Sequence, residues 1–381
     1  MKKKSFLLYL KFIFWFSFSL IATISLVNYY VDPGNIYSSS KKNYNKKRPS
    51  KEFVKQLIKS DNGILFNNNI WNIRDIKKEL AKTPTTADCA ILGSSRVMQI
   101  SSARPIKSLS NICPSLINFG VSGASLEDYL ITSKDLLQNN KPLKTIVIGI
   151  DPWIFILNRD KRWRRHKHDF LVMKGKLEEN SKNLSIKIHN ETLFNTALLF
   201  NLINREYFIR SIKSLLSKKN RLIEHAPIFN YKEGFDRPVL LSDGSGIYTK
   251  NAQKKNRLSK TDGLVSYDIR GISNSKLDSG EWYQEKAIKL FVKLVNHLKK
   301  HFNIVFVITP YHPTVWEITN QPLVKAVKNL EFKVHQIAKT LNVQVIGSFN
   351  PNHVGCTKEE FIDLVHPRDE CVSKLQQFTL N

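Results

Sequence analysis

The sequence is poor in acidic residues: 32 Asp and Glu stand against 59 Lys and Arg, giving a formal net charge of +27. A globular protein with so large an excess of one sign needs an anionic neighbour, such as a phospholipid surface, an acidic glycan or a nucleic acid. Hydrophobic residues still make up 42% of the chain, which is ample for a packed core and excludes a largely disordered protein. The length of 381 residues predicts one large domain or two ordinary ones.

Cysteine is also scarce. The four residues, Cys89, Cys113, Cys356 and Cys371, form no CxxC or CxxH pair, which argues against a zinc site. We expect no metal and no cofactor. An exported location would permit disulfides, and Cys356 and Cys371 are candidates to bridge, although spacing alone does not establish the bond.

Long hydrophobic runs are absent except at the N-terminus. Residues 1–31 open with three lysines, run apolar from Phe12 to about Val27, and end on Tyr29 and Tyr30. A run of about 20 apolar residues can cross a bilayer, and lysines on one side with aromatics at the other edge predict a cytoplasmic N-terminus. A cleavable signal peptide is the alternative, but "LIATIS" is a poor small-x-small cleavage site.

We therefore predict an uncleaved single-pass anchor over residues 1–30 in a bacterial cytoplasmic membrane, with the body of the protein outside the cytoplasm. This location argues against nucleic acid and for the lipid bilayer and an anionic glycan as partners. A body that stays cytosolic is the alternative topology. Residues 31–86 are predicted to be a basic juxtamembrane stalk and lead-in, because residues 32–50 are polar, basic and rich in turn formers.

From about residue 87, short apolar runs alternate with helical stretches, which predicts parallel strands with crossover helices. The expected strands lie within 89–93, 116–123, 144–151, 303–310 and 343–349, and the expected helices within 125–140, 281–301 and 323–342. We predict a flavodoxin-like three-layer α/β/α fold over residues 87–381 with about five parallel strands. A basic insertion at about 154–280, for which the sequence predicts no fold, interrupts this domain.

Ligands of such sheets bind at the carboxyl ends of the strands, so the residues there are the candidates for function. Ser95 follows the first strand, and a serine becomes a nucleophile when a histidine takes its proton and a carboxylate orients that histidine. Asp363 and His366 are three apart, which would place both on one face of a helical turn that Pro367 ends. The backbone N–H groups of Ser95 and Gly123 are candidate oxyanion donors.

These residues together resemble the SGNH (GDSL-like) hydrolases. The Gly-Asp-Ser block of that family is matched by Gly93-Ser94-Ser95, its strand-end glycine by Gly123, and its Asp-x-x-His block by Asp363 and His366. The chain more closely resembles a membrane-anchored branch, similar to the D-alanyl transfer protein of teichoic-acid modification and to alginate O-acetylation proteins. The resemblance covers residues 87–153 and 285–370. It implies ester hydrolysis or O-acyl transfer on an acylated anionic cell-envelope glycan, with Ser95, His366 and Asp363 catalytic.

The third block of the family departs from the pattern. Its Gly-x-Asn-Asp carries an asparagine that donates to the oxyanion, whereas this chain has Asp151 at that position. An ionised aspartate cannot donate, and losing one such donor typically costs ~10²–10³ in turnover. Either Asp151 is protonated, or Arg96 or another group substitutes, or the chemistry differs. The structural alternative is that Asp151 caps a turn or pairs with Arg96.

The basic run over residues 158–169 lies just past the third strand and is a candidate anion-binding segment, although such runs are usually solvated faces. Arginine forks suit phosphate and carboxylate groups. The candidate substrate-binding residues are Arg96, Trp153, Arg162, Trp163, Arg164, Arg165 and His312, with structural roles as the alternative for Trp153 and His312.

A second hypothesis is a non-catalytic protein on a degenerate scaffold of this family, which would bind an envelope polysaccharide or help to assemble the export machinery. An envelope membrane protein would then be a partner. The aspartate at position 151 favours this hypothesis, and the Ser95, Asp363 and His366 set favours the enzyme.

Overall fold

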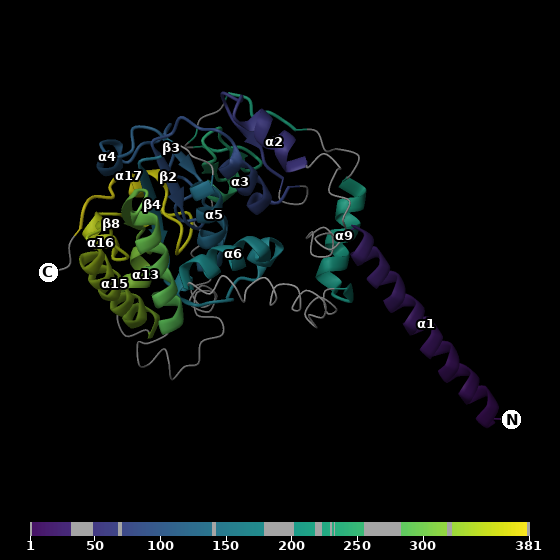
Figure 1. Cartoon of the computed structure of the whole chain (residues 1–381). Coiled ribbons are helices and arrows are strands. Elements are labelled where there is room, and N and C mark those ends of the chain that lie inside the picture. The colour runs from purple at the N-terminus through teal and green to yellow at the C-terminus, as the bar shows by residue number, and fades with distance from the viewer. Residues whose placement is uncertain are drawn as a thin grey trace. The chain divides into compact units, whose positions relative to one another are not determined.

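The computed structural model describes residues 2–31, 49–67, 71–138, 142–178, 202–217, 223–228, 231, 233–254, 283–317 and 322–378. These residues divide into two compact units (Figure 1). One contains helices α1 (Lys2–Val31) and α9 (Arg205–Ser217), and the other contains both sheets and the remaining helices. The predicted stalk falls largely on residues 32–48, outside the described residues.

The strands of the second unit are β1 (Ile64–Leu65), β2 (Cys89–Leu92), β3 (Leu116–Asn118), β4 (Thr145–Ile150), β5 (Val239–Leu240), β6 (Gly246–Ile247), β7 (Asn303–Ile308) and β8 (Gln344–Gly347). Its α-helices are α2 (Pro49–Leu57), α3 (Ile73–Lys82), α4 (Lys107–Ser110), α5 (Leu126–Gln138), α6 (Lys167–Glu178), α10 (Lys250–Lys254), α13 (Glu285–Lys299), α14 (Pro313–Glu317), α15 (Pro322–Leu341), α16 (Pro351–Val354) and α17 (Asp369–Ser373). Three 3₁₀ turns complete it: η2 (Pro152–Phe155), η3 (Arg162–His166) and η5 (Lys358–Glu360).

The main sheet has five strands in the order β3-β2-β4-β7-β8, and every neighbouring pair is parallel. Counted along the chain this is the order 2-1-3-4-5 of doubly wound sheets, which reverses direction between β2 and β4. All five predicted strands are confirmed. Their sequences could be read because a central parallel strand is buried on both faces and is therefore a nearly continuous apolar run.

Both faces of this sheet are packed. On one face, Val305 and Val307 of β7 belong to a buried cluster that also contains Cys356 and Phe361. On the other face, Phe306 packs against Phe291 of α13 with ring centroids 5.5 Å apart. Successive side chains of a strand point to opposite faces, so neighbouring residues of β7 serve the two cores.

Part of the predicted insertion forms a hairpin, β5–β6, which pairs with β1 in a small antiparallel sheet. The hairpin docks on the segment after β2, where Gly246 N–H donates to Met98 O at 2.8 Å. The carboxylate of Asp243 accepts from the Ser101 hydroxyl at 2.6 Å. Residues 179–201, 218–222 and 255–280 of the insertion lie outside the described residues.

A buried lysine ties this hairpin to the main sheet. Lys77 of α3 donates to the carbonyl oxygens of Asn118, at 2.7 Å, and of Gly244 in the hairpin turn. Burial lowers the pKa of Lys77 to about 7, with Asp243 partly opposing the shift. The hairpin is therefore held against the carboxyl end of β3, close to where the predicted site begins.

Helix α1 contains a stretch, Leu8–Val31, that is long and apolar enough to cross a membrane by length and composition. Its 24 residues would extend about 36 Å as a helix, against about 30 Å of bilayer hydrocarbon. The predicted apolar anchor is thus a continuous helix.

Candidate active site

The chain turns sharply after β2, and this turn carries Ser95. A side chain at Gly93 would place its Cβ 2.2 Å from Cγ2 of Val97, so only glycine fits at the start of the turn. Val97 N–H donates to Ser94 O at 3.2 Å, and Arg96 N–H donates to Ser94 Oγ at 3.2 Å. The buried Ser94 therefore closes the turn, and Ser95 is left partly exposed at the end of the strand.

Asp363 and His366 lie in a bent loop, so the predicted helical turn is wrong. The Asp363 carboxylate oxygen Oδ1 accepts the N–H groups of Val365, at 2.9 Å, and of His366, at 2.8 Å. Pro367 closes this loop by pairing with Phe361 in an isolated antiparallel bridge. An aspartate that binds backbone N–H groups two and three residues ahead stabilises a turn without a helix.

The three predicted catalytic side chains meet in one chain of hydrogen bonds. Ser95 Oγ lies 2.8 Å from Nε2 of His366, a residue 271 positions away. Nδ1 of the same ring lies 2.8 Å from Asp363 Oδ2. A carboxylate can only accept, so the imidazole proton belongs on Nδ1, and Nε2 is left to accept the serine proton.

The Asp363 carboxylate is held in its charged form. Burial raises the pKa of Asp363, but hydrogen bonds from the His366 ring, its charge and the two loop N–H groups outweigh burial and lower the pKa below its ordinary value. A charged Asp363 fixes the tautomer of His366 and stabilises the imidazolium that forms when the serine is deprotonated.

The two predicted backbone donors of an oxyanion hole have unused N–H groups. Neither Ser95 N–H nor Gly123 N–H makes a hydrogen bond to another described residue. Their two loops are joined where Val121 N–H donates to Gly93 O at 3.0 Å. Gly123 has φ +60°, a left-handed backbone conformation that favours glycine.

The third predicted oxyanion residue, Asp151, does not face solvent. It is 1% exposed and its Oδ1 lies 3.7 Å from Nε of Arg96. The structure therefore matches the structural alternative, in which Asp151 pairs with Arg96.

Four of the residues predicted to bind substrate are buried, which favours a structural role for each. Arg96 is 0% exposed and donates to the carbonyl oxygens of Thr309 and Pro310. Trp153 donates from Nε1 to Ala124 O at 2.9 Å. The other two are Trp163, whose ring packs on Phe170, and His312, whose Nε2 lies 3.1 Å from Lys358 O.

The arginines of the basic run divide into two groups. Arg165 is mostly buried in an ion pair with Asp75 at 2.9 Å. Arg164 is exposed, and the side chain of Arg162 is 49% exposed while its Nη2 donates to Ser122 O at 2.8 Å. Its Nε also donates to Asp160 Oδ2 at 2.8 Å, so Arg162 sits against the turn that contains Gly123 as one half of an ion pair.

Sequence reasoning missed Tyr248, which follows the docked hairpin. Its hydroxyl donates to Ser95 O at 3.0 Å, and its ring meets the His366 ring edge-on with centroids 5.8 Å apart. Burial, with smaller contributions from nearby carboxylates, raises the pKa of Tyr248 well above its ordinary value, so the hydroxyl keeps its proton. Gln99 was missed too; its Nε2 donates to Pro367 O at 2.6 Å and links the serine and histidine loops. Neither residue belongs to a motif or a periodic pattern.

Replacing Tyr248 by phenylalanine is expected to slow the reaction of Ser95 about tenfold and to destabilise the fold by about 1 kcal/mol, because Ser95 O loses its buried donor. The measurements are the rate of fluorophosphonate labelling and thermal unfolding of the full chain in detergent. Tyr129→Phe is a matched control, since the buried Tyr129 hydroxyl also donates to a backbone oxygen, Gly149 O, at 2.6 Å. The control should lose stability but keep its labelling rate, and equal rates in the two variants would contradict a positioning role for Tyr248.

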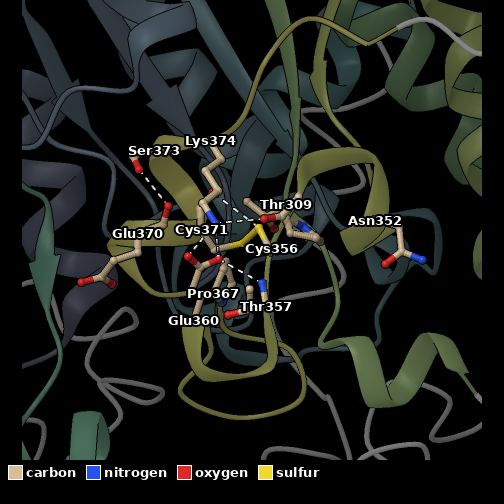
Figure 2. Close-up of a disulfide and its surroundings, with 12 residues drawn as sticks. Thr309, Asn352, Cys356, Thr357, Glu360, Pro367, Glu370, Cys371, Ser373 and Lys374 are labelled. Carbon is tan, nitrogen blue, oxygen red and sulfur yellow. Dashed lines mark hydrogen bonds and ion pairs between the residues drawn. A yellow bond between two sulfur atoms is a disulfide. The ribbon is translucent and has the colours of Figure 1, made fainter.

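Two disulfides enclose the candidate catalytic residues. Cys356 and Cys371 are bonded, as the sequence allowed, and Asp363 and His366 lie between them. Cys89 and Cys113, a pair that was not predicted, are bonded across the segment that contains Ser95. Figure 2 shows the Cys356–Cys371 bond beside Lys374, whose Nζ lies 2.6 Å from Glu360 Oε1 and adds a second tie to the same loop.

Neither protein-family models nor curated proteins match this sequence. In the part of the chain that the structure describes, no group of three or more His, Cys, Asp or Glu side chains could hold a metal ion. The site therefore has to be understood from its own residues.

Proposed function

We propose that this chain is a membrane-anchored extracytoplasmic serine esterase or O-acyltransferase. The observation that carries the proposal is the continuous relay from Ser95 Oγ through the His366 ring to the Asp363 carboxylate, with both contacts at 2.8 Å. A serine next to a histidine that is itself oriented by a carboxylate is the arrangement that activates a hydroxyl for attack on a carbonyl.

In the proposed mechanism, Ser95 Oγ attacks an ester carbonyl while Nε2 of His366 takes its proton. The N–H groups of Ser95 and Gly123 stabilise the oxyanion. The imidazolium then returns the proton to the departing alcohol, which leaves an acyl group on Ser95. Water or a glycan hydroxyl gives its proton to His366 and attacks that acyl group, and His366 then returns the proton to Ser95 Oγ as the serine leaves. The choice between the two acceptors decides between hydrolysis and transfer.

We also propose that the domain is a flavodoxin-like three-layer α/β/α fold of the SGNH hydrolase type. The 2-1-3-4-5 strand order and the packing of α13 and the Cys356 cluster on opposite faces support this fold. Ser95 follows β2, at the reversal of strand order where ligands of such sheets bind.

The location and the substrate class follow from the charge, the anchor and the cysteines. Two disulfides favour an oxidising compartment, and α1 would retain the domain at the membrane. A net charge of +27 favours an anionic substrate. An acylated anionic cell-envelope glycan meets these requirements.

The test is covalent labelling of the full chain in detergent with a fluorophosphonate probe. We expect the wild type to be labelled at Ser95 and Ser95→Ala to remain unlabelled. Ser110→Ala is the matched control, because the Ser110 hydroxyl donates to Lys107 O within its own turn, and this variant should be labelled normally. A folded wild-type protein that is not labelled would refute the enzyme.

A non-catalytic envelope protein is the second candidate, and the paired, buried Asp151 is the observation that favours it. Such a protein would bind the polysaccharide without modifying it. It would retain glycan binding in Ser95→Ala and show no labelling in the wild type, which distinguishes it from the enzyme.

A further inference from the structure

Helix α9 carries an apolar face of which Ile209, Leu215 and Leu216 are exposed while Phe208 and Ile212 are half-buried. Phe208, Ile209, Ile212, Leu215 and Leu216 follow the i, i+1, i+4, i+7, i+8 spacing of one helical face. Ile209 and Leu215 are each 41% exposed and Leu216 is 77% exposed.

The buried side of the same helix carries Tyr207 and Ser211. Ser211 is 0% exposed, and Tyr207 one turn earlier is also buried. A helix in a water-soluble protein normally buries its apolar face and exposes its polar face. The exposed apolar side chains of α9, Ile209, Leu215 and Leu216, indicate that something other than water surrounds this face.

The buried side of α9 is attached to the end of α1 through one asparagine. Asn28, 0% exposed, donates from Nδ2 to Leu202 O at 2.7 Å. Its Oδ1 accepts from the Ser211 hydroxyl at 2.9 Å. Asn28 lies three residues before the last residue of α1, so α9 is attached at one end of the apolar Leu8–Val31 stretch.

The opposite part of α1 makes no such contact. Residues 8–21 are all exposed and largely aromatic or aliphatic. If these residues lie in the hydrocarbon core, the end at Asn28 lies at the boundary with the headgroups, next to Tyr29 and Tyr30, which suit that boundary. Helix α9 is then at the depth where amphipathic helices bind.

We propose that α9 is a second membrane-binding element, which lies in the headgroup boundary of the bilayer that α1 enters and inserts the face formed by Phe208, Ile209, Ile212, Leu215 and Leu216 among the lipids. The exposed side chains of Arg205 and Lys213 would contact anionic headgroups, consistent with the strongly basic chain. The proposal depends on α1 being a membrane span and is independent of the catalytic proposal.

The experiment uses single cysteines as labelling sites. All four natural cysteines are in disulfides, so a cysteine introduced into the unreduced full chain is the only free thiol. Leu216→Cys reports on the apolar face and Glu206→Cys on an exposed polar position of the same helix. Leu20→Cys reports on the middle of the apolar stretch of α1. Each is labelled with an environment-sensitive fluorophore and reconstituted at high dilution into vesicles of phosphatidylcholine with a minority of phosphatidylglycerol.

A lipid with a doxyl quencher near the headgroup end of its acyl chain then tests for lipid contact. The label at Leu216→Cys is expected to be quenched about twofold or more, and that at Glu206→Cys is expected to change little. The label at Leu20→Cys should instead respond to a quencher near the middle of the acyl chain. Labelling of Ser95 by a fluorophosphonate is measured on the same preparations, so failure of the lipid contact and failure of the enzyme are separate results.

Three outcomes would overturn the proposal. An unquenched label at Leu216→Cys in a polar environment would mean that the face is in water. An unquenched label in an apolar environment would mean that a second copy covers the face. No quenching at Leu20→Cys by either lipid would show that α1 does not span the bilayer.

Discussion

Replacing Asp363 by asparagine is expected to slow the reaction of Ser95 by about 10⁴-fold. The asparagine retains an oxygen for the loop N–H groups of Val365 and His366, so the loop should keep its shape. Its amide group would face Nδ1 of His366 as a donor and would favour the wrong tautomer, with the proton on Nε2. Nε2 could then no longer accept the proton of Ser95. The measurements are the rate of labelling by a fluorophosphonate and the rate of hydrolysis of a small ester.

The matched control for this prediction is Asp369→Asn. Asp369 is a neighbouring, partly exposed aspartate that also binds a cationic partner, with oxygens 2.8 and 2.9 Å from Nη1 of Arg104. This variant should react at the wild-type rate, and equal slowing of both variants would mean that the effect is structural.

The lowered pKa of Asp363 also determines how its ionisation changes the stability of the fold with pH. Its folded-state pKa lies below its ordinary value, so its ionisation stabilises the fold above the unfolded-state pKa, near 3.9, and this contribution disappears as the pH falls through the folded-state pKa. At neutral pH the charge is fully present, and only a substitution removes it.

Replacing Arg96 by methionine is expected to destabilise the protein by about 3–5 kcal/mol. Arg96 is fully buried, its guanidinium lies 4.3 Å from the centre of the Tyr311 ring, and its Nε faces Asp151 at 3.7 Å. Removing it leaves the Asp151 carboxylate buried without that positive charge, and also removes the donor to Thr309 O and Pro310 O. The measurement is denaturant unfolding of the full chain in detergent.

Two further variants make this prediction specific. Adding Asp151→Asn to Arg96→Met should recover part of the lost stability, because the buried charge is removed together with its partner. Arg104→Met, which breaks the partly exposed pair with Asp369, should cost only about 0–1 kcal/mol. If Arg96→Met costs no more than Arg104→Met, the buried pair does not stabilise the fold.

The sheet could be predicted from the sequence because its signal is local. Each central strand, such as β4 over Thr145–Ile150, is buried along its whole length and is therefore a continuous apolar run. The β5–β6 hairpin has strands of two residues each, too short for any periodicity, and so Tyr248, which follows it, could not be found.

The site was predicted in part for the same reason. Asp363 and His366 were recognised by their spacing, but a spacing of three fits a loop as well as a helical turn, and the loop was decided by the backbone contacts of Asp363. Arg96 read as a ligand-binding residue because it is charged and follows a strand. Its burial depends on the carbonyl oxygens of Thr309 and Pro310, more than 200 residues away, which no local pattern reveals.

The two disulfides divide the site into two covalent rings. Ser95 lies in the ring closed by Cys89 and Cys113, and Asp363 and His366 lie in the ring closed by Cys356 and Cys371. Each ring confines its residues even in an unfolded chain, since a crosslink restricts mainly the unfolded state. Asp363 and His366 therefore remain close neighbours when other parts of the domain unfold. The contact between Ser95 and His366 is the one link of the relay that joins the two rings. Partial unfolding would therefore break the relay by separating the two rings, while each ring stays closed.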